Sequence, residues 1–258
     1  MPTWRAEKPA PLWTTPTGNA AGRRLPPIGY NKGMRRVWAI ADTHLSFAKP
    51  KPMHIFGEHW RDHPARIAES CHKVIAPNDL LLMPGDLSWA MKRREAVPDL
   101  DFLAALPGTK VLCKGNHDYW WDSDRALDFP GLHDTPWLSD DGMVGVAGTR
   151  GWMAPTAQMT AEERAQCDKI STRELARLER RLQGIASARH KFALVHYPPL
   201  DCFRDLLASQ GVEAILYGHL HLNGNEYPLP EQWHGLRALC VAADRLHFVP
   251  RLVAALDD

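Results

Sequence analysis

The sequence contains no long apolar run. Nothing in its 258 residues approaches the ~20 consecutive apolar residues of a membrane-spanning helix, and the pair Leu12-Trp13 is far too short for the core of a secretory signal peptide. The five cysteines are odd in number, widely spaced and without a C-x-x-C pair, which argues against a disulfide framework; each is expected to be a small buried apolar residue. These absences predict a cytoplasmic protein that does not act in a membrane.

The sequence also lacks an excess of charge of either sign. Its 31 Lys and Arg residues stand against 30 Asp and Glu residues, which leaves a formal net charge of +1. Proteins that track a nucleic-acid backbone or adhere to an acidic membrane usually carry a strongly basic surface, so nucleic acid is a possible partner that the composition does not favour. The hydrophobic content of 45% is ordinary and supports one large domain with a substantial core.

Residues 1–33 have a composition unlike the rest of the chain. They contain six prolines and four glycines, and their charged side chains are basic apart from Glu7. Because such a segment buries little apolar surface, we expect a poorly ordered basic extension followed by a single domain over residues 34–258. Contact of this arm with a polyanion is the functional alternative. Met34 is a candidate start of the native protein, a hypothesis that native chains beginning before Met34 would disprove.

Short apolar runs alternate with helical patterns from Met34 onward. The runs at 37–41, 80–83, 111–113, 143–147, 192–195 and 214–217 are bounded by Gly, Pro or Asp and are expected to be strands. Apolar spacing predicts helices over residues 60–74, 160–189 and 203–207, the second opened by a capping box of Thr160 and Glu163. Residues 236–242 and 246–249 are expected to form a closing hairpin. The alternation is typical of an α/β sheet covered by helices.

Five short polar motifs each directly follow an apolar run. They read Asp42-Thr43-His44, Gly85-Asp86, Gly115-Asn116-His117-Asp118, Val195-His196 and Gly218-His219-Leu220-His221. Ligands of an open α/β sheet gather at the carboxyl ends of its strands, so the motifs should meet at one edge. Gly85 and Gly115 should permit sharp backbone turns just ahead of the polar residues.

The motifs supply seven candidate metal ligands, which are carboxylates, imidazoles and one amide: Asp42, His44, Asp86, Asn116, His196, His219 and His221. Without a thiolate, this set disfavours a closed structural zinc site and suits Mn, Fe or Zn, with Mg and Co as alternatives among which donor type alone does not choose. Seven ligands exceed the need of one tetrahedral ion and suit two ions that share a carboxylate. In an extended chain, Asp42 and His44 should point the same way because they are two residues apart. The same holds for His219 and His221.

The ordered motifs D-x-H, G-D, G-N-H-D, a lone His and G-H-x-H resemble those of the calcineurin-like metallophosphoesterases. The resemblance runs from Asp42 to His221 and implies a four-layer α/β/β/α sandwich with a dinuclear metal site at the carboxyl ends of the strands. It implies a division of the ligands in which Asp86 bridges two divalent ions, expected to be Mn, Fe or Zn. The first ion would be bound by Asp42, His44 and His221, and the second by Asn116, His196 and His219.

The same resemblance implies hydrolysis of a small phosphomonoester or phosphodiester by in-line attack of a hydroxide that bridges the two ions. His117 would be the general acid that protonates the leaving oxygen, and Asp118 could orient it or be a simple turn residue. A metal-poor interaction scaffold of the same fold is one alternative, although a scaffold would be expected to lack ligands. A nuclease using the same site is another, supported only by the basic N-terminal arm.

Substrate contacts are expected from residues close to the motifs. Arg150 follows a predicted strand and could clamp a phosphate, or form a structural ion pair. Trp120 and Trp121 could stack on a nucleobase or sugar, or pack in the core. The cluster of His54, His59 and His63 is expected to be solvated or pocket-lining. Residues 45–64, a potential lid, and residues 148–168 are the predicted determinants of specificity.

Overall fold

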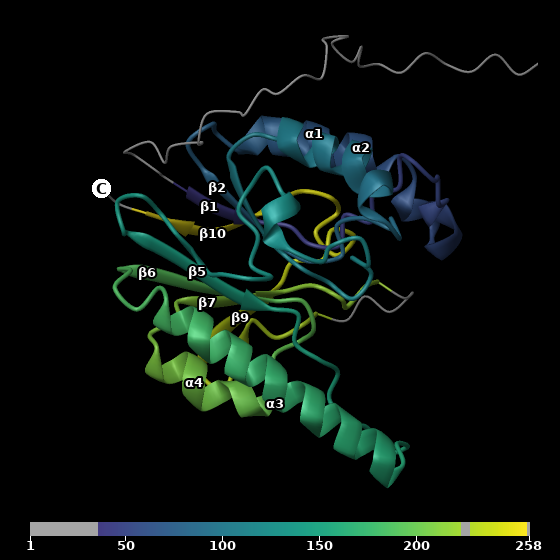
Figure 1. Cartoon of the computed structure of the whole chain (residues 1–258). Coiled ribbons are helices and arrows are strands. Elements are labelled where there is room, and N and C mark those ends of the chain that lie inside the picture. Colours follow the sequence, from purple (N-terminus) through teal and green to yellow (C-terminus); the bar gives the residue numbers. More distant parts are fainter. Residues whose placement is uncertain (1–35, 223–227, 257–258) are drawn as a thin grey trace, which may run out of the picture.

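The computed structural model describes residues 36–222 and 228–256. They form four layers, in which two sheets pack face to face and each sheet carries two longer helices on its outer surface (Figure 1). The predicted four-layer α/β/β/α sandwich is confirmed. The predicted extension over residues 1–33 and the candidate start at Met34 lie outside the described residues.

The first sheet is built around three parallel strands and carries the N-terminal helices. Its strand order is β10-β1-β2-β3, with β10 antiparallel to β1. Its strands are β1 (Arg36–Ala39), β2 (Leu80–Pro84), β3 (Thr109–Cys113) and β10 (Arg251–Ala255). The helices of this half are η1 (Met53–Phe56), η2 (Glu58–Trp60), α1 (His63–Val74), α2 (Arg93–Ala105) and η3 (Asp124–Ala126).

The second sheet has the order β4-β5-β6-β7-β9-β8, with four central parallel strands and antiparallel edges. Its strands are β4 (Trp137–Leu138), β5 (Val144–Thr149), β6 (His190–Val195), β7 (Ala214–Tyr217), β8 (Gln232–Trp233) and β9 (Leu236–Cys240). The helices on its outer side are α3 (Ala161–Gln183), η4 (Asp201–Phe203) and α4 (Arg204–Ser209). No helix in the described ranges is long and apolar enough to cross a membrane.

The central strands, such as β2 and β7, are apolar because both of their faces are buried. In β2, Leu80 and Leu82 point between the two sheets, whereas Leu81 and Met83 pack under α1 and α2. Residues of the second sheet such as Phe192 fill the layer between the sheets from the other side. This two-sided burial explains why each strand reads as a continuous apolar run and ends where the first polar residue appears.

Helix α3 begins at the predicted place, whereas α1 begins at His63, three residues after the predicted start at residue 60. Pro64 occupies the first turn of α1, where its missing N–H costs nothing. The predicted capping box of α3 is present: Thr160 Oγ1 accepts from the Glu163 N–H at 3.2 Å, and Glu163 Oε2 accepts from the Thr160 N–H at 2.8 Å. The N-terminal part of α3 extends beyond the sheet (Figure 1). Helix α2 was not predicted, and its interior holds Pro98, a residue that ordinarily interrupts a helix.

The predicted closing hairpin is wrong. Strand β9 pairs in parallel with β7, residues 246–249 form a turn, and the chain then crosses to the first sheet as β10. In that turn Phe248 is buried against Trp60, with ring centroids 5.2 Å apart, so its apolar character reflects packing under α1 and not strand pairing. The expectation of buried cysteines holds for Cys71, Cys113 and Cys167, whereas Cys202 is exposed and Cys240 is half-buried.

Candidate metal centre

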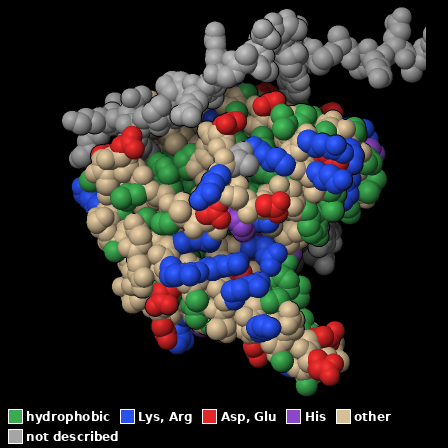
Figure 2. Space-filling model, viewed as in Figure 1, with side chains coloured by type: hydrophobic (Ala, Val, Ile, Leu, Met, Phe, Trp, Pro, Cys, Tyr) green, Lys and Arg blue, Asp and Glu red, His purple; other side chains and the backbone are tan. Residues whose placement is uncertain are grey.

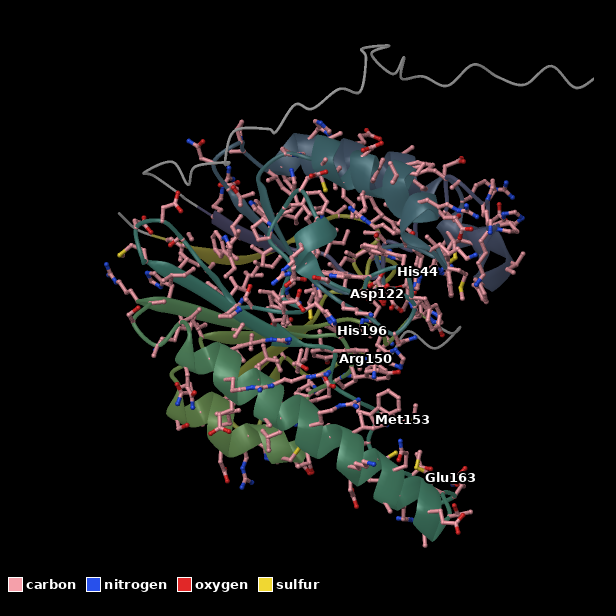
Figure 3. All side chains as sticks on the ribbon, viewed as in Figure 1. His44, Asp122, Arg150, Met153, Glu163 and His196 are labelled. Carbon is pink, nitrogen blue, oxygen red and sulfur yellow. The ribbon has the colours of Figure 1, made fainter. Side chains whose placement is uncertain are left out.

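The five polar motifs meet at one end of the sandwich. They leave the first sheet after β1, β2 and β3, and the second sheet after β6 and β7. Figure 3 shows His44 from the first sheet and His196 from the second at the same end of the layer between the sheets. The carboxyl ends of parallel strands therefore bring together groups that are up to 179 residues apart in the sequence, from Asp42 to His221.

One group of donors consists of Asp42, His44 and His221. The Nε2 atoms of His44 and His221 lie 3.1 Å apart, and Asp42 Oδ1 lies 3.7 Å from His221 Nε2 and 4.0 Å from His44 Nε2. All three donor atoms lie within 4.8 Å of one another. Donor atoms this close and pointing at a common centre suit a cation better than they suit one another.

A second group of donors surrounds the side-chain oxygen of Asn116. Its Oδ1 lies 2.8 Å from His196 Nε2 and 3.0 Å from His219 Nδ1. Asp86 lies between the two groups, since its Oδ2 is 3.3 Å from His196 Nε2 and 3.9 Å from His44 Nε2. The seven predicted ligands thus form two adjoining groups around Asp86, and Asp42 also lies within 4.8 Å of the donor atoms of Asp86 and His196. Their assignment as ligands remains a prediction.

The electrostatics of the centre fit divalent cations. Asp42 and Asp86 are buried, and burial raises the pKa of Asp42 to about 7, against the opposing charge of His196. Burial alone would also raise the pKa of Asp86, but the charge of His196 and its hydrogen bond outweigh that effect and lower it. Protonated imidazoles therefore compensate the negative charge of Asp86 but do not fully compensate that of Asp42. Divalent ions would supply that charge to a donor set of suitable chemistry.

Four of the candidate ligands have left-handed backbone conformations. The φ angles of Asp42, His44, Asp86 and His219 are 56°, 44°, 53° and 68°. Each such conformation costs roughly 1 kcal/mol or more in a residue other than glycine, and such strain clusters at functional sites. The two D-x-H and H-x-H pairs are therefore not extended, and that part of the prediction is wrong. The side chains of both pairs nevertheless converge on the site, as predicted.

Two glycines of the motifs allow the aspartate carboxylates to approach the backbone. A Cβ atom on Gly115 would lie 2.1 Å from Asp86 Oδ1, and one on Gly218 would lie 2.2 Å from Asp42 Oδ2. The predicted sharp turn is present at Gly85, whose φ is 94°. Gly115 does not adopt a positive φ. Glycine is required there because a side chain would collide with Asp86, and not because the backbone makes an unusual turn.

Hydrogen bonds fix which nitrogen of two candidate ligands faces the centre. His196 donates through Nδ1 to the carbonyl oxygen of Pro84 at 3.1 Å, and His221 donates through Nδ1 to Asp244 Oδ1 at 3.2 Å. In both rings Nε2 is left as the free donor atom. The sequence reasoning missed Asp244 because it was placed in a hairpin turn. The signal was present, since Asp244 directly follows the apolar run 238–243, as the candidate ligands follow theirs.

Replacing Asp244 with alanine should weaken the metal site next to His221. The carboxylate also accepts from the backbone N–H of Leu222 at 2.8 Å, so it holds both the ring and its loop. Loss of such an outer partner typically lowers metal affinity about 10–100-fold. Titration of metal content by calorimetry measures the change. Asp201→Ala is the matched control, because Asp201 forms a similar pair with His234 at 2.9 Å on the surface, and it should leave metal affinity unchanged.

His117 lies beside the two donor groups without belonging to either. Its Nε2 is 4.0 Å from Asp86 Oδ2, its side chain is 33% exposed, and its ring packs against Trp89 at a centroid distance of 4.2 Å. Its backbone N–H donates to Asp86 Oδ1 at 2.8 Å. Burial lowers the pKa of His117, and the negative charge of Asp86 opposes this shift. The ring thus lies at the exposed side of the centre, outside both donor groups.

Asp118 does not orient His117, and that prediction is wrong. Asp118 Oδ1 accepts from the backbone N–H groups of Leu87 and Ser88 at 2.9 and 3.1 Å, and its Oδ2 accepts from the Gly115 N–H at 2.8 Å. Trp120 Nε1 also donates to Oδ1, at 3.2 Å. The buried carboxylate therefore connects the loops after β2 and β3, which carry Asp86 and Asn116.

The tryptophans after this motif are not available to a substrate. Trp120 and Trp121 are 2% and 1% exposed and belong to the core under α1 and α2, so the predicted alternative of core packing is confirmed and that of stacking on a substrate is wrong. The segment 45–64 does border the site. Its Met53, Phe56 and Trp60 line a largely apolar cavity of about 240 Å³ together with Trp89, Leu222 and the rings of three histidines, namely His44, His117 and His221.

The three histidines of this segment differ in their exposure. His63 is buried and its Nδ1 lies 3.1 Å from the carbonyl oxygen of Trp60, whereas His54 and His59 are exposed. His59 Nε2 comes within 4.0 Å of Asp244 Oδ2.

Arg150 lies near His196 at the end of β5 (Figure 3), with its guanidinium 4.8 Å from the ring centre of Trp152.

Comparison with known proteins identifies a family and a fold. The family model of the calcineurin-like phosphoesterases matches residues 35–223, and no curated protein matches the chain. A phosphopantetheinyl hydrolase from Mycobacterium tuberculosis is similar in structure, with a TM-score of 0.53, 15% sequence identity, and coverage of 84% of this chain and 95% of that one. A protein of unknown function from Aquifex aeolicus has a TM-score of 0.47, 16% identity and the same coverage. At such identities the likeness concerns the fold alone.

Proposed function

The chain belongs to the calcineurin-like phosphoesterase family, and on that premise we propose that it is a dinuclear metallophosphoesterase that hydrolyses a small phosphomonoester or phosphodiester. The observation that carries the proposal is the division of seven donors into two groups around Asp86, with His117 outside both. An interaction scaffold of this fold would have no reason to keep the donors, the strained backbone and the supporting hydrogen bonds together.

We assign the first divalent ion to Asp42, His44 and His221, and the second to Asn116, His196 and His219, with Asp86 shared. Mn, Fe and Zn all suit these carboxylate, imidazole and amide donors. When bound, such ions withdraw charge from the phosphate and lower the pKa of the attacking water. The protein holds the donors in place through the Asp244 and Pro84 contacts and through the close approach of Gly115 and Gly218.

His117 is proposed as the general acid. Its imidazole is half-buried, open on one side to the cavity lined by Met53, Phe56 and Trp89, and held in place by Trp89. From there it donates a proton to the leaving oxygen and lets the alcohol depart uncharged. A positioned acid of this kind contributes about 10²–10⁴-fold to the rate. The apolar wall of the cavity suits the organic part of the leaving group.

Hydrolysis assays with the full-length chain test the proposal. Protein loaded separately with Mn, Fe and Zn is given an aryl monophosphate, an aryl phosphodiester, cyclic nucleotides and single-stranded DNA, and phosphate or alcohol release is followed. We expect metal-dependent turnover of at least one ester and little of DNA. Absence of hydrolysis with every metal, in a protein that binds them, would favour the scaffold; preferential cleavage of DNA would favour a nuclease.

A further inference from the structure

A cavity with an excess of positive charge lies between α3 and the ends of β3 and β5. It has a volume of about 190 Å³, and its charged lining consists of Lys114, Arg150, Arg173, Arg177, Arg181 and the carboxylate of Glu174. Figure 2 shows Lys and Arg side chains gathered on this face of the molecule, over α3 and the strand ends. For a chain with a formal net charge of +1, five cations around one cavity are a local concentration of charge.

The single carboxylate of the cavity is already shared. Glu174 Oε1 lies 2.7 Å from Arg177 Nη1 and 3.6 Å from Arg173 Nε. In the part of the chain that the structure describes, Lys114, Arg150 and Arg181 have no carboxylate oxygen within 4.0 Å. Carboxylates such as Asp122 near Lys114 and Glu174 near Arg181 act on these cations only from a longer distance, so a ligand that enters the cavity meets a net positive charge.

Neutral groups hold these three cations in place. Arg181 is buried and donates to the carbonyl oxygens of Gly148 and His133, and Lys114 Nζ donates to the carbonyl oxygen of Trp121. Arg150 lies over the ring of Trp152. Burial lowers the pKa of Arg181 although the charge of Glu174 opposes this shift, so an anionic ligand in the cavity would stabilise the charged guanidinium.

The basic cavity adjoins the second donor group of the metal centre. Lys114 comes two residues before Asn116, and the carbonyl oxygen of Arg150 accepts from the backbone N–H groups of His196 and Tyr197, each at 3.1 Å. The apolar cavity, in contrast, borders His44 and His221 of the first donor group. The centre therefore has an apolar side and a cationic side, and a substrate can extend from it in both directions.

We propose that the basic cavity binds a second phosphate group of the substrate, so that the preferred substrates are phosphate esters that carry two phosphates. This inference rests on the proposed function. A guanidinium group can bind two phosphate oxygens at once. The cavity has five cations and one carboxylate, and this excess of positive charge suits a phosphate dianion better than a ligand with one carboxylate. Arg150, for which the sequence predicts a phosphate clamp or a structural ion pair, is assigned to this subsite.

Paired substrates test the subsite. The ratio of kcat/KM for a bisphosphate to that for the matching monophosphate is measured with adenosine 3′,5′-bisphosphate against adenosine 5′-monophosphate and with fructose 1,6-bisphosphate against fructose 6-phosphate. We expect a ratio of at least about tenfold in one pair, because a charge-assisted hydrogen bond contributes at least that factor. The double variant Arg150→Gln, Arg177→Gln should bring that ratio close to one. Arg180→Gln, an exposed change on α3 outside the cavity, should leave it unchanged.

A binding measurement separates this inference from the proposed function. Methylenediphosphonate, which resists hydrolysis, is titrated into the metal-loaded chain by calorimetry, and its affinity should fall about tenfold in the double variant but not in Arg180→Gln. If no ester is hydrolysed while this loss is seen, the proposed reaction fails and the anion site stands. If esters are hydrolysed but neither the ratio nor the affinity changes in a folded double variant, the subsite is wrong and any bound anion is incidental.

Discussion

Replacing His117 with alanine should lower kcat by about 10²–10⁴-fold while leaving the metal content of the protein nearly intact. The expectation follows from the position of the ring, which faces the apolar cavity and approaches Asp86 only to 4.0 Å. Its backbone N–H, which does bind Asp86, is retained in the variant. Steady-state hydrolysis of an aryl phosphate together with elemental analysis of the purified variant gives both quantities.

The leaving group provides a second readout for His117. A general acid matters most when the departing oxygen is basic, so the loss of rate should be larger for an alkyl phosphate than for a nitrophenyl phosphate. Tyr119→Phe is a suitable control, because Tyr119 is exposed two residues along the same loop. Loss of bound metal in His117→Ala, or an equal loss of rate for both esters, would contradict the role of His117 as the general acid.

Replacing Asp86 with asparagine should remove both metal ions and, with them, the activity. Asparagine keeps the shape of the side chain but takes away the one carboxylate that lies between the two donor groups, 3.3 Å from His196 and 3.9 Å from His44. Because Asp86 is itself a proposed ligand, the fall in metal affinity should exceed the roughly 10–100-fold typical of an outer partner. Elemental analysis and hydrolysis assays on the dialysed variant measure it.

A buried carboxylate elsewhere controls for general damage to the fold. Asp79 is 1% exposed and accepts from Trp38 Nε1 at 2.9 Å, and it precedes β2, whereas Asp86 follows the opposite end of that strand. Asp79→Asn should therefore reduce thermal stability without changing metal content. An Asp86→Asn protein that melts cooperatively and still holds two ions would contradict the bridging assignment.

The positions of the candidate ligands could be predicted because of how the strands are buried. A parallel strand covered on both faces is apolar until it leaves the sheet, so the first polar residue marks its carboxyl end. Asp42 and His196 follow this rule, and Asp244 follows it equally, although it was read as part of a turn. Local pattern alone did not reveal that β9 joins β7 in parallel or that β10 crosses to the other sheet.

Contacts between side chains are harder to predict from the sequence than the positions of the motifs. Asp118 follows His117 in the chain, yet its carboxylate accepts from backbone N–H groups of the loop after β2, about 30 residues earlier in the chain. Trp120 and Trp121 lie next to the same motif but point into the core. Neighbours in sequence face opposite sides of a strand or loop, so adjacency does not predict contact.

The sequence by itself determined the α/β alternation, the set of polar groups at the strand ends and their order, because burial and strand length are recorded in local apolar pattern. Only the tertiary structure decided the division of those groups around Asp86, the support of His221 by Asp244 and the gathering of Lys114, Arg150 and Arg181 around one cavity. Such pairings depend on how two sheets and a helix pack, and no local pattern records the distance between segments that lie far apart in the chain.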